Sequence, residues 1–311
     1  MGVHEAPLGS EDRARDPDAS LPPLVRMLRV HHWTKNGFIL LPLPFALRVG
    51  SQLDGPVFAA GLFGFCLLSS AVYVLNDLRD AEADRLNPRK RHRPIAAGSV
   101  GRGTAWAVFA ALAIAAVGMG LATGLPAVLG LFGVYAAANL AYSFGAKHVP
   151  VLDVFILASG FVVRVLVGCA LVQARPSGWL LLCSSGLALF LAFAKRRGDL
   201  VEGMGPDHRP ALAGYSLAYL DAALAISAGI SLLSYALYSV EAGVLVPGRE
   251  LAGLVFVAFA IFEYLRLIYT RGEGASPVEG ASPVAVAFRY RSLQAAGLLW
   301  MLATAWSLGL F

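Results

Sequence analysis

The residues best suited to chemistry form an acidic stretch at the end of an apolar run. If this run is a helix that continues, Asp77, Asp80 and Asp84 share one helical face, with Asn76 a turn before Asp80. Three carboxylates on one face repel each other, but they can hold Mg²⁺, which takes carboxylate ligands and completes its shell with phosphate oxygens. The alternative is a solvated helix end paired with neighbouring arginines. We predict a magnesium site, because the acidic face lies where a predicted membrane span meets water.

A basic cluster follows the acidic stretch directly. Arginine binds phosphate through forked hydrogen bonds and lysine binds it as a point charge. The alternative is a patch that orients the chain and contacts lipid headgroups. Nearby carboxylates favour phosphate, because a metal and cations together can clamp a diphosphate. The basic side chains of this cluster are Arg89, Lys90, Arg91, His92 and Arg93.

Composition indicates which elements position these groups. The chain has 311 residues, of which 57% are hydrophobic and only 14% are charged, and its mean hydropathy is +0.65. Such a chain is too apolar for an ordinary soluble protein, and a span needs about 20 residues to cross the hydrocarbon core. We therefore predict an all-α polytopic membrane protein with nine transmembrane helices. The expected spans are 36–51, 55–77, 103–122, 125–144, 151–172, 178–196, 216–239, 250–270 and 293–311.

The distribution of positive charge predicts the orientation. Of the 25 Lys and Arg residues, 21 fall in the N-terminal segment and in alternate connections between spans. The positive-inside rule places these segments in the cytoplasm and Phe311 on the far side of the inner (plasma) membrane. Residues 1–23 are polar, lack the apolar core of a signal peptide and are expected to form a disordered cytoplasmic tail. Residues 24–311 are expected to form a single catalytic domain.

A second group of candidates lies around the fifth span. Tyr142 and Lys147 precede it, and could be an interfacial aromatic and a snorkelling anchor or parts of a site. Asp153, at its start, is harder to explain without a function. Arg164 lies within the span, where a guanidinium needs a partner. It could pair with an acid on a neighbouring helix or contact a ligand.

Two further clusters follow. Lys195 and Arg196 end the sixth span, and helical continuation would gather Lys195, Asp199 and Glu202 on one face as a polar site of mixed charge. The last cluster comprises Arg266, Arg271, Phe288, Arg289, Tyr290 and Arg291.

The position of these groups favours an enzyme over a transporter. A pump or channel more often scatters ionisable groups along its spans, whereas here only Arg164 lies deep within one. Nearly all other candidates lie in the cytoplasmic connections. This arrangement suits a water-soluble substrate that arrives from the cytoplasm and a lipid substrate that enters from the bilayer.

The acidic N-D-x-x-D-x-x-x-D stretch resembles the first motif of the UbiA-type intramembrane prenyltransferase superfamily. Three segments resemble the superfamily's decaprenyl-phosphate phosphoribosyltransferase branch in actinobacteria, and the resemblance extends over nearly the whole chain from about Leu24. Two departures are present: the superfamily's Tyr-x-x-x-Lys pattern is one residue longer here, and a basic run holds the place of its second aspartate-rich motif. The three segments run from Val30 to Asn36, from Arg89 to Gly98 and from Tyr142 to Asp153, and Lys195-Arg196-Arg197 also matches.

The resemblance implies a nine-helix bundle with its cavity open to the cytoplasm. It also implies Mg²⁺-dependent transfer of 5-phosphoribose from phosphoribosyl diphosphate to a polyprenyl (decaprenyl) phosphate, which supplies the arabinose donor for cell-wall arabinan. Asp77, Asp80 and Asp84 would be catalytic. Phosphates of the two substrates would be bound by cations, with Lys35 near the lipid phosphate. The remaining candidate substrate ligands are Asn76, Lys90, Arg91, Arg93, Tyr142, Lys147, Asp153, Arg164, Lys195 and Arg196.

Three other functions stay open on sequence alone. A true prenyltransferase would consume a prenyl diphosphate and an aromatic or other acceptor. A transporter or channel would give flux without a product. A tailoring enzyme of secondary metabolism would use the same scaffold on another acceptor. Small residues in the spans would allow a homo-oligomer, membrane lipids are expected contacts, and no nucleic-acid partner is expected.

Overall fold

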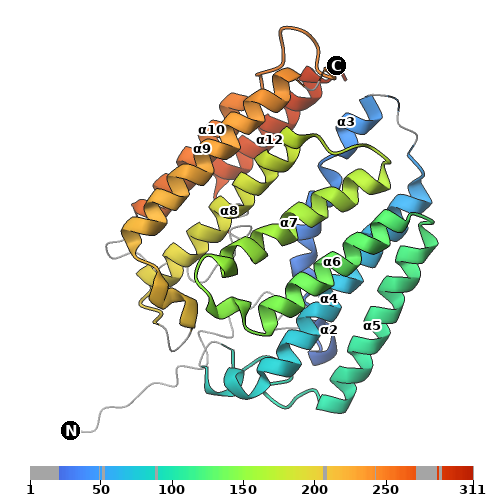
Figure 1. The fold of residues 1–311 in the computed structure, drawn as a ribbon, viewed down its shortest axis with the longest axis vertical. Helices are drawn as coiled ribbons and strands as arrows, with labels where there is room; N and C mark the ends of the chain where they lie inside the picture. Colours follow the sequence, from blue (N-terminus) through green and yellow to red (C-terminus); the bar gives the residue numbers. More distant parts are fainter. Residues whose placement is uncertain are drawn as a thin grey trace. The chain divides into compact units, whose positions relative to one another are not determined.

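The computed structural model describes residues 21–48, 50, 53–87, 90–205, 209–241, 243–270, 286 and 289–310. Every regular element in these ranges is a helix (Figure 1), which confirms the all-α prediction. The predicted tail lies outside the described residues up to residue 20, and Pro23 already begins a helix. Arg89, Arg271 and Phe288, named in the basic clusters, also lie outside them.

The chain divides into two compact units that we describe separately. The first comprises Met1–Gly37 and Ala59–Phe132, and the second comprises Phe38–Phe58 and Gly133–Phe311.

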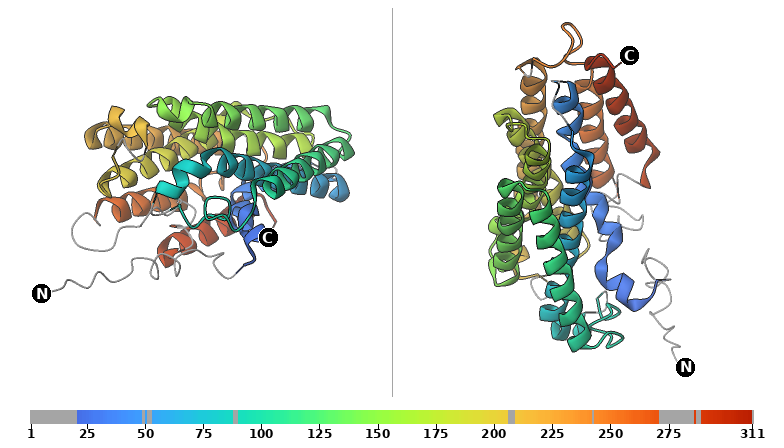
Figure 2. Two further views of the ribbon diagram at one scale, coloured as in Figure 1. Left: turned by 90° about the horizontal axis from the view of Figure 1, so that it is seen from below. Right: turned by 90° about the vertical axis from the view of Figure 1, so that its right-hand side faces the viewer.

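The first unit is built around helix α4, Gly55–Leu86, and helix α5, Arg102–Ala122, which run beside each other in Figures 1 and 2. Gly64 permits their close approach, because a Cβ there would lie 3.0 Å from Cβ of Met119. The unit also contains helix α2, Pro23–Leu28, and most of the 3-10 helix η1, Val30–Leu40. Its polar end is supported by an apolar cluster whose buried members are Met27, Val74, Leu78, Ala81, Ile95, Val100 and Ala105.

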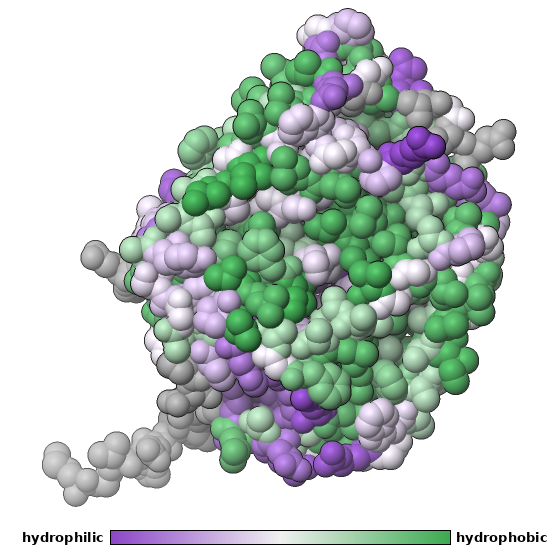
Figure 3. All heavy atoms as spheres, viewed as in Figure 1, coloured by the Kyte–Doolittle hydropathy of each residue, from purple (hydrophilic) through white to green (hydrophobic). Residues whose placement is uncertain are grey.

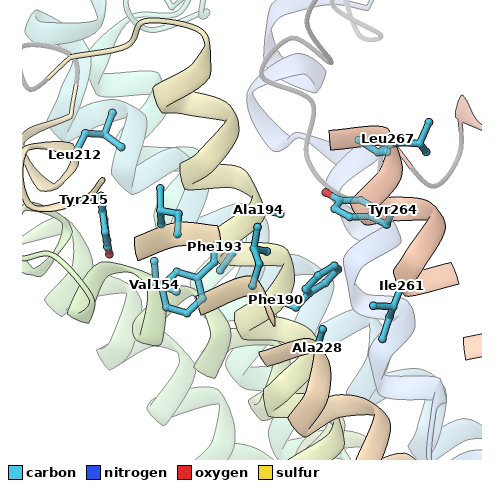
Figure 4. Packing of buried hydrophobic residues seen from close by; sticks show 14 of the residues in the cluster. Val154, Phe190, Phe193, Ala194, Leu212, Tyr215, Ala228, Ile261, Tyr264 and Leu267 are labelled. Carbon is cyan, nitrogen blue, oxygen red and sulfur yellow. The ribbon is translucent and has the colours of Figure 1, made fainter. Parts of the chain in front are cut away.

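The second unit has its core where helix α8, Gly178–Val201, and helix α9, Leu217–Glu241, pack together (Figure 4). Their contact is close because a Cβ at Gly186 would lie only 2.9 Å from the backbone nitrogen of Ser231. The large buried side chains of this core include Phe190, Phe193 and Tyr264. The helices of the unit are α3 (Leu43–Arg48), η2 (Ala146–His148), α7 (Leu152–Leu171), α8 (Gly178–Val201), η3 (Pro210–Gly214), α9 (Leu217–Glu241), α10 (Leu254–Tyr269) and α12 (Arg291–Ser307), while α6 (Pro126–Ser143) begins in the first unit and ends in this one.

Six of the described helices are long and apolar enough to cross a membrane, namely α4, α5, α6, α7, α8 and α9. Large apolar side chains such as Ile114 and Ile226 point outward and are 72% and 63% exposed. Figure 3 shows hydrophobic side chains over much of the visible face, as expected for helices whose solvent is lipid. Helices α10 and α12 have 16 and 17 residues and coincide with the last two predicted spans.

The first predicted span differs from the expectation. Residues 36–51 do not form one α-helix, because the 3-10 helix η1 ends at Leu40 and α3 begins at Leu43. Pro42 lies at this junction and cannot donate a backbone hydrogen bond. Its carbonyl instead accepts the N–H of Ala46 and so begins α3.

Candidate functional site

The acidic stretch belongs to α4, which continues without a break to Leu86. Asp77 and Asp84 lie about two turns apart on one face, and only 3% and 2% of each residue is exposed. Their burial follows from their neighbours Leu78 and Ala81, which anchor this end of α4 in the apolar cluster of the first unit. The predicted helical continuation is therefore confirmed, and it buries two of the three carboxylates.

These two carboxylates share one cation. Nη1 of Arg93 donates to Oδ2 of Asp84 at 2.7 Å and to Oδ1 of Asp77 at 3.2 Å. Nη2 of Arg29 donates to both carboxylate oxygens of Asp77, at 2.6 and 2.8 Å. Nζ of Lys90 lies 3.7 Å from Oδ1 of Asp84. The structure thus brings the predicted residues Asp77, Asp84, Lys90 and Arg93 into one cluster, which we call the Arg93 cluster.

The loop after α4 positions Arg93. The backbone carbonyl of Arg93 accepts the N–H of Ala97 at 2.8 Å, and Ile95 and Val100 of the same loop are buried against α4. On the other side, Arg29 caps the C-terminus of α2 with φ 50° and ψ 50°, a left-handed conformation that is uncommon for residues other than glycine. Its guanidinium also lies 5.3 Å from the centre of the Tyr73 ring.

Four other predicted residues belong to the same unit. Asp80 and Asn76 are partly buried on α4, Lys35 is partly buried in η1, and the side chain of Arg91 is exposed. Within the described parts of the chain, no group of three or more His, Cys, Asp or Glu side chains is placed to hold a metal ion. Asp77 and Asp84 are the two carboxylates that contact Arg93, and the role of Asp80 as a third metal ligand stays a prediction.

A second polar cluster lies in the second unit, around Arg196 of α8. Nε of Arg196 donates to Oδ2 of Asp153 at 2.6 Å, and neither side chain is exposed to solvent. Nη1 of Arg196 lies 3.3 Å from Oδ2 of Asp199, which also accepts from Nη1 of Arg209 at 2.9 Å. We call these four residues and Tyr215 the Arg196 cluster, because the hydroxyl of Tyr215 donates to Oδ1 of Asp153 at 2.6 Å. Burial, together with this bond, raises the pKa of Tyr215 and keeps the hydroxyl protonated.

Three other predicted residues lie at or near this cluster. Tyr142, near the end of α6, lies beside Arg196 and within hydrogen-bonding reach of its side chain. Lys147 lies in η2 and Lys195 lies beside Arg196 in α8, and both are partly buried. The structure therefore gathers predicted residues from three helices and one connection.

Arg164 has its partners within the second unit. Its Nη1 donates to the carbonyl of Gly160 at 2.7 Å, and its Nη2 lies 3.3 Å from the hydroxyl of Tyr135. The guanidinium also lies 5.0 Å from the centre of the Tyr135 ring and 5.7 Å from that of Phe161. A carbonyl, a phenol and two aromatic faces thus surround this buried cation.

Two other arginines of the second unit, Arg197 and Arg266, form ion pairs near contacts between helices. Nε of Arg197 donates to Oδ1 of Asp221 at 2.6 Å, and the Arg197 guanidinium stacks 4.2 Å from the centre of the Tyr269 ring, so it ties α8 to α9 and α10. Arg266 pairs with Glu263 one turn earlier on α10 at 2.7 Å, and the hydroxyl of Ser292 donates to the same carboxylate.

Sequence reasoning passed over Arg29, Arg209 and Tyr215. Arg29 and Arg209 were counted only as positive charges that set the orientation, and neither belongs to a spaced motif. Tyr215 follows the short helix η3 and contacts Asp153 across 62 residues of chain. No local pattern signals such a contact.

The chain is similar to known proteins over most of its length. Residues 38–279 match the model of the UbiA prenyltransferase family. The decaprenyl-phosphate phosphoribosyltransferase of Corynebacterium glutamicum is 33% identical over 305 residues, which cover 94% of this chain and 88% of that enzyme. The enzyme of the same name from Mycolicibacterium smegmatis is 36% identical over 224 residues, which cover 70% of each chain.

A solved structure supports the fold. The UbiA homolog from Archaeoglobus fulgidus bound to GPP and Mg²⁺ superimposes with a TM-score of 0.67 at 18% identity, and the match covers 92% of this chain and 98% of that one. At this level of identity, the likeness concerns the fold.

Proposed function

Because this chain belongs to the UbiA prenyltransferase family, we propose that it transfers 5-phosphoribose from phosphoribosyl diphosphate to a polyprenyl phosphate such as decaprenyl phosphate. The products are polyprenyl-phosphoryl-5-phosphoribose and pyrophosphate, and the lipid product is a precursor of the arabinose donor for cell-wall arabinan. The observation that carries this proposal is the similarity to the Corynebacterium glutamicum phosphoribosyltransferase over 94% of this chain. The predicted superfamily and the prediction of a multi-pass, membrane-embedded transferase are confirmed by the family match and the apolar helices.

The Arg93 cluster fits a divalent cation. Asp77 and Asp84 are buried carboxylates directed at one shared cationic nitrogen, and Mg²⁺ is typically held by one or two carboxylates together with substrate phosphates. Asp77 and Asp84 would hold the metal, with Asp80 and Asn76 assisting from the same helix. Mg²⁺ held there would offset the negative charge that develops on the departing diphosphate.

The cations of this cluster bind the same diphosphate. Arg93 is 26% exposed and Lys90 is 38% exposed, so both side chains can move from a carboxylate to a phosphate oxygen. Arg91, exposed on the same loop, adds a further donor. Charge-assisted hydrogen bonds of this kind orient the diphosphate and stabilise it as the bond to the anomeric carbon breaks.

The acceptor needs no strong general base. A lipid phosphate is already an anionic oxygen nucleophile, and transfer at the anomeric carbon passes through an oxocarbenium-like state, as in other sugar chemistry. The roles left for protein groups are to bind and position phosphate. We assign these roles to Lys35 for the lipid phosphate and to Lys147, Lys195 and Arg196 for the 5-phosphate or the lipid phosphate. Tyr142, Asp153 and Arg164 complete the proposed set of substrate-binding residues.

For the architecture we propose nine transmembrane helices in one catalytic domain with a cytoplasm-facing cavity. The N-terminus and the charged connections would lie in the cytoplasm, with the C-terminus on the far side of the inner membrane. The charge asymmetry of the sequence supports this orientation. Lipid contacts and a homo-oligomer are part of the same proposal.

The test is a reaction with purified protein in nanodiscs. Mg²⁺, phosphoribosyl diphosphate and decaprenyl phosphate are supplied, and the lipid fraction is analysed by mass spectrometry, with a parallel reaction in EDTA. We expect a phosphoribosylated lipid that disappears in EDTA. The matched arm supplies GPP and an aromatic acceptor, since the Archaeoglobus fulgidus homolog was solved with GPP. A product in this arm alone would contradict the proposal and assign prenyl transfer.

A further inference from the structure

Tyr215 joins two segments that lie far apart in sequence. Its hydroxyl accepts the N–H of Val151 at 2.6 Å and donates to Oδ1 of Asp153 at 2.6 Å. Its ring is buried in the core cluster of the second unit, near Leu212 and Val154 in Figure 4. One phenol oxygen therefore fixes both the turn before α7 and the first acidic residue of α7.

The turn that Tyr215 holds is strained. Val151 has φ 67° and ψ −50°, and a positive φ is a true outlier for a β-branched residue. Strain of this kind persists only where the surroundings impose it, and it gathers at functional sites. Packing adds to the constraint, because a Cβ on Gly214 would lie 2.3 Å from Cγ of Pro150. The segment from Lys147 to Val151 is therefore packed closely against η3.

The same contacts determine the orientation of Arg196. Oδ1 of Asp153 is occupied by Tyr215, so Oδ2 is directed to Nε of Arg196 at 2.6 Å. Nη1 of Arg196 is directed to Asp199 at 3.3 Å. In the described part of the chain, Nη2 is buried and has no hydrogen-bond partner. A buried guanidinium donor without a partner is costly, unless a ligand accepts its hydrogen bond.

We propose that Tyr215 is a positioning residue that, through Asp153 and the Val151 turn, holds Arg196 with Nη2 ready to bind a phosphate oxygen of the substrate. The carboxylates of Asp153 and Asp199 already offset the charges of Arg196 and Arg209. Lys147 in η2 and Lys195 in α8 add positive charge to this part of the second unit. A phosphate oxygen would supply the acceptor that Nη2 of Arg196 lacks.

This inference rests on the proposed function for its substrates, and the phosphate could belong to phosphoribosyl diphosphate or to the lipid. The experiment compares Tyr215→Phe, which removes only the hydroxyl, with Tyr219→Phe. Tyr219 is the matched control, because its ring lies 5.8 Å from that of Tyr215 but is 44% exposed. KM and kcat are measured for each substrate in turn with the other saturating, and thermal denaturation is followed with and without inorganic pyrophosphate and inorganic phosphate.

We expect Tyr215→Phe to raise the KM of one substrate about tenfold while kcat changes less than about twofold, which is the pattern of lost ground-state binding. The substrate whose KM rises identifies the source of the phosphate. We also expect the thermal stabilisation by phosphate or pyrophosphate to be lost in Tyr215→Phe and kept in Tyr219→Phe. A purely structural residue would lower stability in all conditions without moving one KM selectively.

Equal KM values for the wild type and Tyr215→Phe would overturn the inference. If the wild type makes no phosphoribosylated lipid, the proposed function fails and the denaturation arm decides the inference alone. Anion-dependent stabilisation that Tyr215→Phe removes would then support the inference. Stabilisation that is equal in both proteins, or absent from the wild type, would contradict it.

Discussion

The Arg93 and Arg196 clusters use the same parts in different ways. In each, two buried aspartates share one arginine, Asp77 and Asp84 in the first case and Asp153 and Asp199 in the second. The shared guanidinium of the first cluster comes from a loop and is 26% exposed, whereas that of the second comes from within α8 and is 0% exposed.

The exposure of the arginine decides whether a ligand can replace it as the partner of the two aspartates. Solvent reaches the arginine of the first cluster, so another cation can replace it at a smaller cost than in a fully buried pair. A fully buried pair leaves an uncompensated charge when one partner is removed. We therefore regard the Arg93 cluster as a place for ligands to exchange, and the ion pairs of the Arg196 cluster as a fixed framework.

The largest expected effect is a loss of turnover when the aspartates of the Arg93 cluster are changed. Asp77→Asn and Asp84→Asn each remove a charge that a metal needs, so we expect phosphoribosyl transfer to fall by about 100-fold or more. The thermal denaturation midpoint should change little. Turnover and midpoint are measured on the same preparations, and near-normal turnover in both variants would rule out this metal site.

The next largest effect is a loss of stability when an aspartate of the Arg196 cluster is changed. Asp153→Asn leaves the fully buried Arg196 without its closest counter-charge, and breaking such a pair typically costs about 3–5 kcal/mol. We expect a large drop in the denaturation midpoint, measured by size-exclusion chromatography after heating in detergent. Asp77→Asn is the matched comparison, and equal drops in the two variants would remove the distinction between the clusters.

A smaller effect, on the KM of the donor, is expected when Arg93 is changed. Arg93→Ala removes one charge-assisted contact to the diphosphate, which predicts a rise of about tenfold in the KM of phosphoribosyl diphosphate. Arg102→Ala is the control, because this arginine is 64% exposed and pairs only loosely with Glu82 at 3.7 Å. An unchanged KM in Arg93→Ala would show that the loop does not bind the donor.

The smallest effect concerns the strained turn of the second unit. Val151→Gly relieves a γ-turn conformation that is strained by about 1–3 kcal/mol for a residue with a side chain, but glycine costs about 0.5–1 kcal/mol of chain entropy. The net change should be a gain of between about 0 and 2.5 kcal/mol. Val149→Gly provides the opposite sign, since Val149 is extended with φ −95° and ψ 117°, and a fall in the midpoint for both variants would contradict the assignment of strain.

Much of the fold could be predicted from hydrophobicity and charge. The expected spans 103–122, 151–172 and 178–196 match α5, α7 and α8 within a few residues, because long apolar runs bounded by polar or Gly/Pro residues admit few other structures in a bilayer. The first span could not be predicted as closely, because the effect of Pro42 on local backbone geometry depends on what packs around it.

Part of the Arg93 cluster could also be predicted, because its members lie close together in the sequence. Asp77 and Asp84 share a face because the helical repeat fixes their separation, and Arg93 follows within the same basic run. Tyr215 and Arg29 could not be found in this way, because they reach their carboxylates across 62 and 48 residues of chain. Contacts of this range depend on how the elements pack, and spacing alone does not record that.

The length of α4 has a consequence for how a highly charged donor is handled. Its 32 residues make a rod of roughly 48 Å, while the hydrocarbon layer is only about 30 Å thick. A helix that entered this layer near Gly55 would leave it by about Leu75, and the first carboxylate, Asp77, follows two residues later. In the proposed orientation α4 would therefore carry its carboxylates to the level of the lipid headgroups, where the proposed donor would keep its hydration until it is bound and only the isoprenoid tail of the proposed acceptor would remain in the hydrocarbon layer.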